Sequence, residues 1–200
     1  MVKFVYLASQ SPRRRQLLEQ LGVRYELLLP DGSEDAEALE RVLQNEAPDV
    51  YVKRVTGLKL DAASARLARR QLPPAPILCS DTTVALGRII YGKPNDPEDA
   101  ERMLTELSGR THRVLTAVNV QCGLQRFQAL STSRVSFEPM TSHQISCYVA
   151  TGEPLGKAGA YAIQGRVSMH ITRIDGSYSG IMGLPLWETA TLLRAAGLDI

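Results

Sequence analysis

Two apolar runs with a helical pattern between them open the chain, and this order constrains the fold more than any other feature. "VKFVYLA" (residues 2–8) predicts a buried strand, and "RYELLLP" (residues 24–30) predicts a second strand. Residues 11–21 predict the helix between them, with Ser11 as its N-cap and Pro12 at its first position. A strand–helix–strand opening favours an α/β fold.

The rest of the chain continues to mix helical and extended patterns. No internal repeat, low-complexity segment or clear linker interrupts them, so we expect one domain over residues 1–200. Helices are predicted over residues 37–43, 48–70, 96–109, 142–151 and 184–197, and strands over residues 77–86, 89–91, 113–138 (two or three strands) and 167–174.

Three consecutive arginines, Arg13, Arg14 and Arg15, fall in the first turn of the helix predicted at residues 11–21. The free N–H groups of a helix N-terminus carry positive partial charge, so arginines are locally unfavourable there. The placement therefore suggests a negatively charged partner outside the helix. Phosphate groups suit such a position.

The helical period separates the three arginines. Arg14 lies four residues before Leu18 and seven before Leu21, so it continues the apolar stripe of the helix. Arg13 lies at the edge of that stripe, whereas Arg15 points away from it. We expect Arg13 and Arg14 to bind an anion; the alternative is a solvated basic turn.

A lysine interrupts the apolar stripe of the helix predicted at residues 48–70. Val52, Val55 and Ala62 form the stripe, and Lys59 falls between them. Lysines in such positions usually bury the stem of the side chain and leave the ammonium in water. The alternative is an ammonium that reaches into a cleft toward phosphate oxygens.

Asp81 stands inside the apolar run "ILCSDTTVAL". A carboxylate there is costly unless it is paired or binds a metal, so we expect a catalytic or metal-binding group. The alternative is an aspartate that caps a turn. Lys93 follows within the reach of a hairpin, and the loop "PDGSED" offers Glu34 or Asp35 as a second acidic group.

Length, charge and cysteine content exclude several classes of protein. The 200 residues suffice for a sizeable core, and a net charge of +2 with interspersed signs argues against coating nucleic acid. The three cysteines fit neither a disulfide framework nor a zinc site. No apolar run reaches the length of a membrane span or of a secretion signal. We expect a cytoplasmic protein with neither nucleic acid nor membrane as partner.

Several common catalytic signatures are missing from the sequence. It has no Walker A loop, no GxGxxG after a strand, no GxSxG and no CxxC, and its three histidines have no ligand spacing. What remains is two arginines, two lysines and one or two carboxylates. This set suits metal-assisted attack on a polyphosphate.

Five segments in this order resemble the Maf-like nucleotide pyrophosphatases, over residues 3–197. They are "LASQSPRRRQLLEQLG", "CSDTTVALGRIIYGKP", "LSGRTHRVLTAV", "KAGAYAIQG" and "GSYSGIMGLPLWET". The resemblance implies an α/β fold with an elongated mixed sheet flanked by helices and two lobes around a deep cleft, similar to the inosine-triphosphate pyrophosphatases. It also implies a homodimeric cytoplasmic enzyme that hydrolyses nucleoside triphosphates to monophosphate and pyrophosphate with a divalent cation (Mg, Mn or Co).

The resemblance also assigns roles to residues. Asp81 matches the proton acceptor and a metal-binding position, and Glu34 is assigned to the second, metal-linked acidic position. The pattern of Arg13, Thr82 and Gln164 matches the subgroup acting on dTTP and UTP, in which these residues set base choice. The residues that match phosphate-facing positions are Ser9, Arg13, Arg14, Lys59 and Lys93.

Two functions of other classes remain open. A nucleotide-binding regulator of cell division or septum formation would use the same cleft without significant turnover. A nucleic-acid binder would use the arginine run, but the near-neutral charge and the few interleaved aromatic residues disfavour it.

Overall fold

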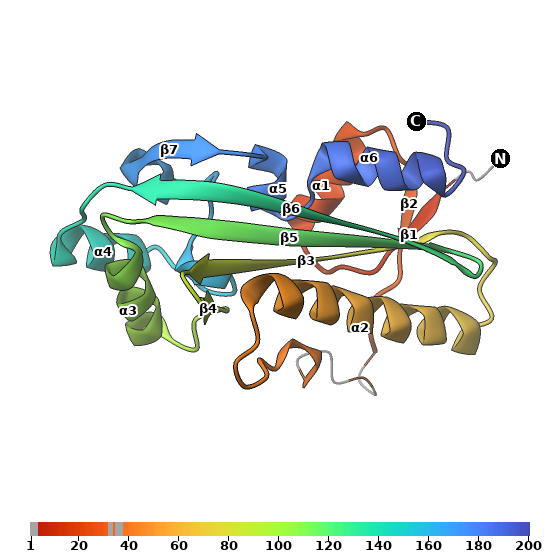
Figure 1. Cartoon of the computed structure of the whole chain (residues 1–200), viewed down its shortest axis with the longest axis horizontal. Helices are drawn as coiled ribbons and strands as arrows, with labels where there is room; N and C mark the ends of the chain where they lie inside the picture. Colours follow the sequence, from red (N-terminus) through yellow and green to blue (C-terminus); the bar gives the residue numbers. More distant parts are fainter. Residues whose placement is uncertain (1–3, 32–33, 35–37) are drawn as a thin grey trace.

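One mixed β-sheet of seven strands organises the protein, with the order β2-β1-β3-β5-β6-β7 and with β4 paired to β3 (Figure 1). The computed structural model describes residues 4–31, 34 and 38–200. Helices cover both faces of the sheet, so the expected α/β class with an elongated, mixed sheet is confirmed.

The strand–helix–strand opening is confirmed, and it forms the parallel part of the sheet. β1 (Val5–Leu7) pairs in parallel with β2 (Tyr25–Leu27) on one side and with β3 (Ile77–Leu86) on the other. The other strands pair antiparallel: β4 (Ile89–Tyr91), β5 (Thr111–Cys122), β6 (Gln125–Phe137) and β7 (Ile171–Asp175).

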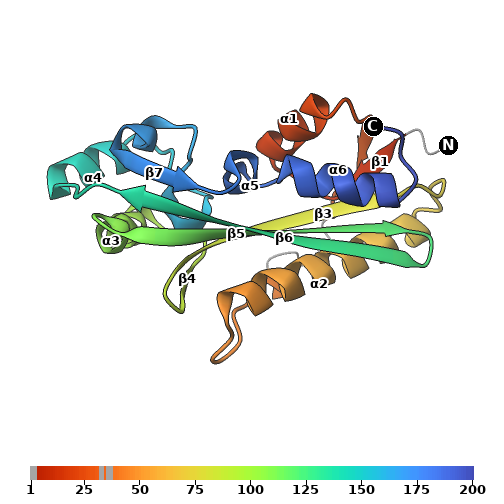
Figure 2. The ribbon, with the colours of Figure 1, turned by 45° about the horizontal axis from the view of Figure 1, so that its top comes forward.

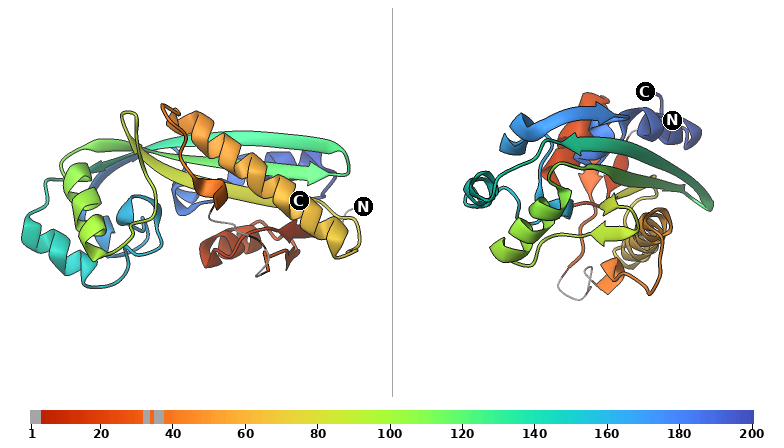
Figure 3. Two further views of the ribbon diagram at one scale, coloured as in Figure 1. Left: turned by 90° about the horizontal axis from the view of Figure 1, so that it is seen from below. Right: turned by 60° about the vertical axis from the view of Figure 1, so that its left-hand side comes forward.

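Three helices pack on the half of the sheet that holds both chain termini (Figures 1 and 2). α1 (Pro12–Gln20) and α6 (Leu186–Ala195) lie on one face, where Leu18 and Leu193 join an apolar core with β1, β3 and β5. α2 (Pro48–Arg69) lies diagonally across the opposite face (Figure 3) and buries its apolar stripe on β3 and β5.

A second lobe forms around the other ends of the long strands β3, β5 and β6. α3 (Pro97–Leu107), α4 (Ser142–Val149) and the 3-10 helix η2 (Ala158–Ala160) share one apolar core there with β5 and β6. Because the long strands run through both lobes, they fix the cleft between them.

The helix starts agree with the sequence signals to different degrees. Asp96 caps α3 as predicted, since its side chain accepts a 2.7 Å hydrogen bond from the backbone N–H of Asp99. Ser11 occupies the N-cap position of α1, but its side chain makes no capping hydrogen bond. The helix predicted at residues 37–43 is reduced to the 3-10 helix η1 (Ala38–Glu40) within the described residues.

The strand predicted at residues 167–174 is wrong in its first half. Residues Arg166–His170 form the 3-10 helix η3, and the strand β7 starts at Ile171. Val167 and His170 are both buried and lie three residues apart, which is the period of a 3-10 helix and not of a strand. The short helix α5 (Tyr178–Met182) was not predicted.

In the part of the chain that the structure describes, no helix has both the length and the apolar character needed to cross a lipid bilayer.

Candidate active site

A cleft of about 690 Å3 lies between the two lobes, within the range of about 300–1,000 Å3 usual for small-ligand sites. The start of α1, η1, α2, β3 and the segment of residues 156–164 line it. Among the described residues, every residue to which the sequence analysis gave a role lines this cleft except Glu34.

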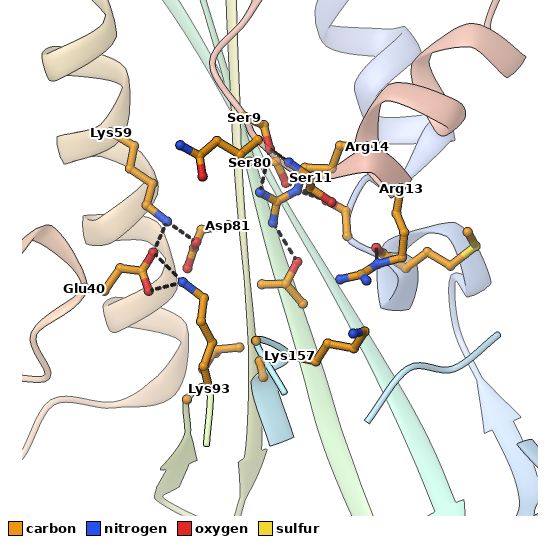
Figure 4. A pocket seen from close by; sticks show the side chains of 18 of the residues that line it. Ser9, Ser11, Arg13, Arg14, Glu40, Lys59, Ser80, Asp81, Lys93 and Lys157 are labelled. Carbon is orange, nitrogen blue, oxygen red and sulfur yellow. Dashed lines mark hydrogen bonds and ion pairs between the residues drawn. The ribbon is translucent and has the colours of Figure 1, made fainter. Parts of the chain in front are cut away.

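Two lysines and two carboxylates form one cluster on the α2 side of the cleft (Figure 4). Lys59 Nζ lies 2.5 Å from Oδ1 of Asp81 and 2.8 Å from Oε1 of Glu40. Lys93 Nζ lies 3.1 Å from Oε2 of the same Glu40. Lys59 therefore reaches into the cleft from its apolar stripe, where its ammonium bonds to two carboxylates.

The fold fixes both carboxylates of this cluster. Asp81 is only 8% exposed, because β3 runs between β1 and β5 in the middle of the sheet. Tyr51 of α2 donates a 2.8 Å hydrogen bond to the backbone carbonyl of Glu40 and so holds η1 against the cleft. Burial alone would raise the pKa of Glu40, but the ammoniums of Lys59 and Lys93 outweigh it and lower that pKa.

Arg14 lies on the opposite, α1 side of the cleft and bonds only to uncharged oxygens among the described residues. It donates to the Gly183 carbonyl (2.8 Å), to Oγ of Ser9 (3.2 Å) and to Oγ1 of Thr82 (3.4 Å). Burial lowers the pKa of Arg14, although Asp81 acts in the opposite direction. A half-buried guanidinium with no carboxylate bonded to it favours binding of an anion.

Arg13 and Arg15 differ in position, as the helical period predicts. Arg13 lines the cleft and donates to the backbone carbonyl of Met182 at 3.3 Å, and burial lowers its pKa. Arg15 does not line the cleft. The backbone N–H of Ser11 bonds to Oγ of Ser9 at 3.2 Å, so the loop before α1 also faces the site.

The two other residues assigned to base choice lie on different segments of the cleft wall. Thr82 of β3 shares a 2.9 Å hydrogen bond with Thr116 of β5, which makes it a fixed part of the wall. Gln164 follows η2, is exposed, and has no hydrogen-bond partner for its amide among the described residues. Its amide is thus free to meet a ligand.

Glu34 takes part in a different group of charges. Its carboxylate accepts hydrogen bonds from Arg66 (2.9 Å and 2.5 Å) and Arg69 (2.8 Å), and Arg66 is only 4% exposed. Glu34 is not among the cleft-lining residues, and Asp35 lies outside the described residues. Glu40, and not Glu34, is the glutamate that lies beside Lys59 and Asp81.

The sequence analysis did not single out Glu40 and Lys157, two charged residues that line the cleft. Glu40 lies in an irregular acidic stretch with many carboxylates, and no periodicity distinguishes it from its neighbours. Lys157 lies inside the quoted segment "KAGAYAIQG", and its place beside two glycines was the available signal.

Together the fold and the cleft define an α/β protein whose cleft holds several basic side chains and a buried carboxylate. The chain belongs to the Maf-like protein family, which matches residues 4–196. This membership confirms the resemblance drawn from the five sequence segments.

Curated relatives share most of the sequence. The chain is 72% identical to a protein of Polaromonas sp. over 98% of each chain, and 66% identical to one of Albidiferax ferrireducens over the full length of both. Both relatives are named dTTP/UTP pyrophosphatase. Among solved structures, the Staphylococcus aureus Ham1 protein matches with a TM-score of 0.46 and 12% identity, over 96% of this chain and 97% of that one.

Proposed function

We propose that the protein hydrolyses nucleoside triphosphates, dTTP and UTP above all, to the nucleoside monophosphate and pyrophosphate. The buried carboxylate of Asp81, set in a cleft lined by six basic side chains, is the observation that carries this proposal. The name of the relatives at 72% and 66% identity supports the choice of substrates.

The α1 side of the cleft would bind the polyphosphate. Arg13 and Arg14 supply positive charge, and the start of α1 adds free backbone N–H groups. On the opposite side, the ammoniums of Lys59 and Lys93 are held by carboxylates. They can turn to phosphate oxygens, because a lysine carries three donors on a flexible stem.

The reaction would be attack by water on the α-phosphorus. The water oxygen forms a new bond to phosphorus, the bond to the bridging oxygen breaks, and pyrophosphate leaves with that oxygen. Asp81 accepts the proton of the water as general base. The basic side chains stabilise the negative charge that develops on the leaving group.

Asp81 and Glu40 are the residues that would hold a divalent cation. Their carboxylates already share the Lys59 ammonium, so a positive charge is accommodated between them, and carboxylate oxygens suit Mg2+ and Mn2+. When bound, such an ion would polarise the phosphoryl oxygens and favour deprotonation of water. Ligands beyond two carboxylates would come from water and the substrate phosphates.

Binding of Mn2+, followed by electron paramagnetic resonance, separates the two glutamates. The Glu40→Gln variant should weaken Mn2+ binding, because it removes a charged ligand beside Asp81. Glu34→Gln is the matched comparison and should leave binding unchanged, since its carboxylate is held by Arg66 and Arg69. If Glu34→Gln weakens Mn2+ binding and Glu40→Gln does not, Glu34 and not Glu40 is the metal ligand.

Base choice would rest on Arg13, Thr82 and Gln164. The Gln164 amide offers a donor and an acceptor, as the O4 and N3 positions of uracil and thymine require. Thr82 is small enough to leave room for the base, and Arg13 lines the same cleft.

A panel of nucleoside triphosphates tests the proposal, with pyrophosphate release measured in Mg2+, Mn2+ and Co2+. Turnover of dTTP and UTP above CTP and the purine nucleotides is expected. Tight binding without turnover would instead favour the regulator. A cytoplasmic homodimer remains part of the proposal, and light scattering of the purified protein tests its oligomeric state.

A further inference from the structure

Three basic side chains in the cleft have no carboxylate bonded to them in the described part of the chain. Arg14 and Arg13 come from α1, and Lys157 comes from the loop before η2 in the other lobe. Their hydrogen bonds go to backbone carbonyls or hydroxyls: Lys157 Nζ, for example, lies 3.3 Å from the carbonyl oxygen of Leu155. This contrasts with Lys59 and Lys93, which are both neutralised.

Lys157 and Arg13 face each other across the cleft (Figure 4). Burial lowers the pKa of Lys157, and the positive charge of Arg13 lowers it further, while Glu153 acts weakly in the opposite direction. Among the described residues, no hydrogen bond or ion pair joins Glu153 to this ammonium: the Glu153 carboxylate accepts a 3.0 Å hydrogen bond from the backbone N–H of Arg166, and Lys157 bonds to the Leu155 carbonyl. Two like charges converging on one space are unfavourable unless an anion lies between them.

The backbone around Lys157 is held in a conformation that fixes this arrangement. Gly159 has a φ of +70°, and a Cβ there would lie 2.8 Å from a methyl group of Val84 in β3. Ala160 also has a positive φ, of 58°, and is fully buried. Backbone strain of this kind in a non-glycine residue is typical of functional sites.

The same loop is tied to the loop that carries Lys93. The backbone N–H of Gly159 donates a 3.0 Å hydrogen bond to the carbonyl of Gly92, the residue before Lys93. The second lobe therefore presents both lysines to the cleft from one connected backbone unit. Only Lys157 of the two has its ammonium free of carboxylates among the described residues.

We propose that Lys157 is a phosphate-binding residue, which contacts the polyphosphate from the second lobe opposite Arg13 and Arg14. This inference rests on the proposed function and adds a residue to it. A polyphosphate has several charged oxygens and can bridge three cations that converge from two lobes, whereas a neutral base or ribose cannot offset their repulsion. The substrate itself would then join the two lobes across the cleft.

Calorimetric binding of two probes tests this contact. One probe is α,β-imido-UTP, which resists cleavage, and the other is inorganic tripolyphosphate, which has no nucleoside. For Lys157→Gln we expect the Kd of both probes to rise about tenfold or more, the size of a lost hydrogen bond between charged groups. Lys157→Arg should restore most of the affinity, because it keeps the charge.

Lys53→Gln is the matched control, because Lys53 is exposed on α2 and does not line the cleft. It should leave both values of Kd unchanged. If Lys157→Gln melts at a lower temperature than the wild type, Lys157→Met can replace it, because methionine keeps the apolar stem of the side chain. The Kd of both probes should then rise for Lys157→Met as well.

Two results would overturn the assignment. One is unchanged binding of both probes by Lys157→Gln, and the other is weaker binding of α,β-imido-UTP with unchanged binding of tripolyphosphate, which would place Lys157 at the nucleoside. Failure of the proposed function would look different. The wild type would then bind tripolyphosphate without preferring the nucleotide analogue, and Lys157 would still be needed for that binding.

Discussion

Lys59 Nζ lies 2.5 Å from Oδ1 of Asp81, although one residue comes from the apolar stripe of α2 and the other from the middle strand of the sheet. Each residue looked misplaced in its own sequence pattern. The ion pair between them offsets the cost of placing each charge there, because a buried carboxylate is tolerated when a cation is bonded to it. Both residues line the cleft.

Replacing Asp81 with asparagine should nearly abolish turnover. Loss of a general base typically lowers the rate about 10²–10⁴-fold, and the isosteric amide keeps the shape of the site. Steady-state kinetics with UTP give the rate, and calorimetry with α,β-imido-UTP should show that binding is largely kept.

Asp61→Asn is the matched control for that variant, since Asp61 lies on the exposed side of α2 and pairs with Arg126. Its activity should equal that of the wild type. If Asp81→Asn keeps a third or more of the wild-type activity, another group is the base, and Glu40 is the next to test.

Lys59→Ala and Lys93→Ala should weaken binding of UTP analogues far more than binding of UMP. Both ammoniums can turn from Glu40 to the phosphates, so the effect should grow with the number of phosphate groups. Calorimetry with the two ligands measures the difference. Equal effects on both, or a loss of stability without a binding defect, would make these lysines structural.

Acid should destabilise the protein through Glu34. Hydrogen bonds from Arg66, and then from Arg69, lower the pKa of Glu34 from 4.5 to about 2 in the folded state. A carboxyl with a depressed pKa stabilises the fold above its unfolded pKa, and this stabilisation is lost as the pH falls from 4.5 to about 2.

Urea unfolding across this pH range measures the effect. Wild type should lose more of its free energy of unfolding than Glu34→Gln does, because the amide does not titrate. Glu26→Gln, at an exposed position on β2, is the control and should follow the wild type. Parallel curves for wild type and Glu34→Gln would show that the ion pair with Arg66 contributes no stability.

Gln164→Glu should reduce the preference for UTP and dTTP over CTP. A carboxylate cannot donate a hydrogen bond to O4 of the base, so the mismatch leaves that oxygen without its partner. The ratio of kcat/KM for UTP and CTP is the measurement. An unchanged ratio, with similar loss on both nucleotides, would mean that Gln164 does not contact the base.

Local signals predicted most of the elements. The cap and proline at Asp96 and Pro97 located α3, and the apolar stripes located α1, α2 and α6. The error at residues 167–170 has a simple cause. Val167 and His170 are buried by packing against the second lobe, and a burial period of three in so short a segment is not visible in the sequence.

The site was predictable where a charge broke an apolar pattern. Arg14, Lys59 and Asp81 all did so, and all three line the cleft. Glu40 and Lys157 did not, because they lie in irregular segments whose position depends on tertiary contacts. Tyr51 fixes the first of these segments and Val84 packs against the second. The positions of Glu40 and Lys157 in the cleft could therefore be seen only in the structure.

Phosphorus NMR of UTP incubated with the protein and a divalent cation tests the central claim most directly. The account predicts that the UTP signals are replaced by those of UMP and pyrophosphate in equal amounts, and that Asp81→Asn suppresses this change. Formation of UDP and phosphate, or UTP that stays intact while it binds, would contradict it.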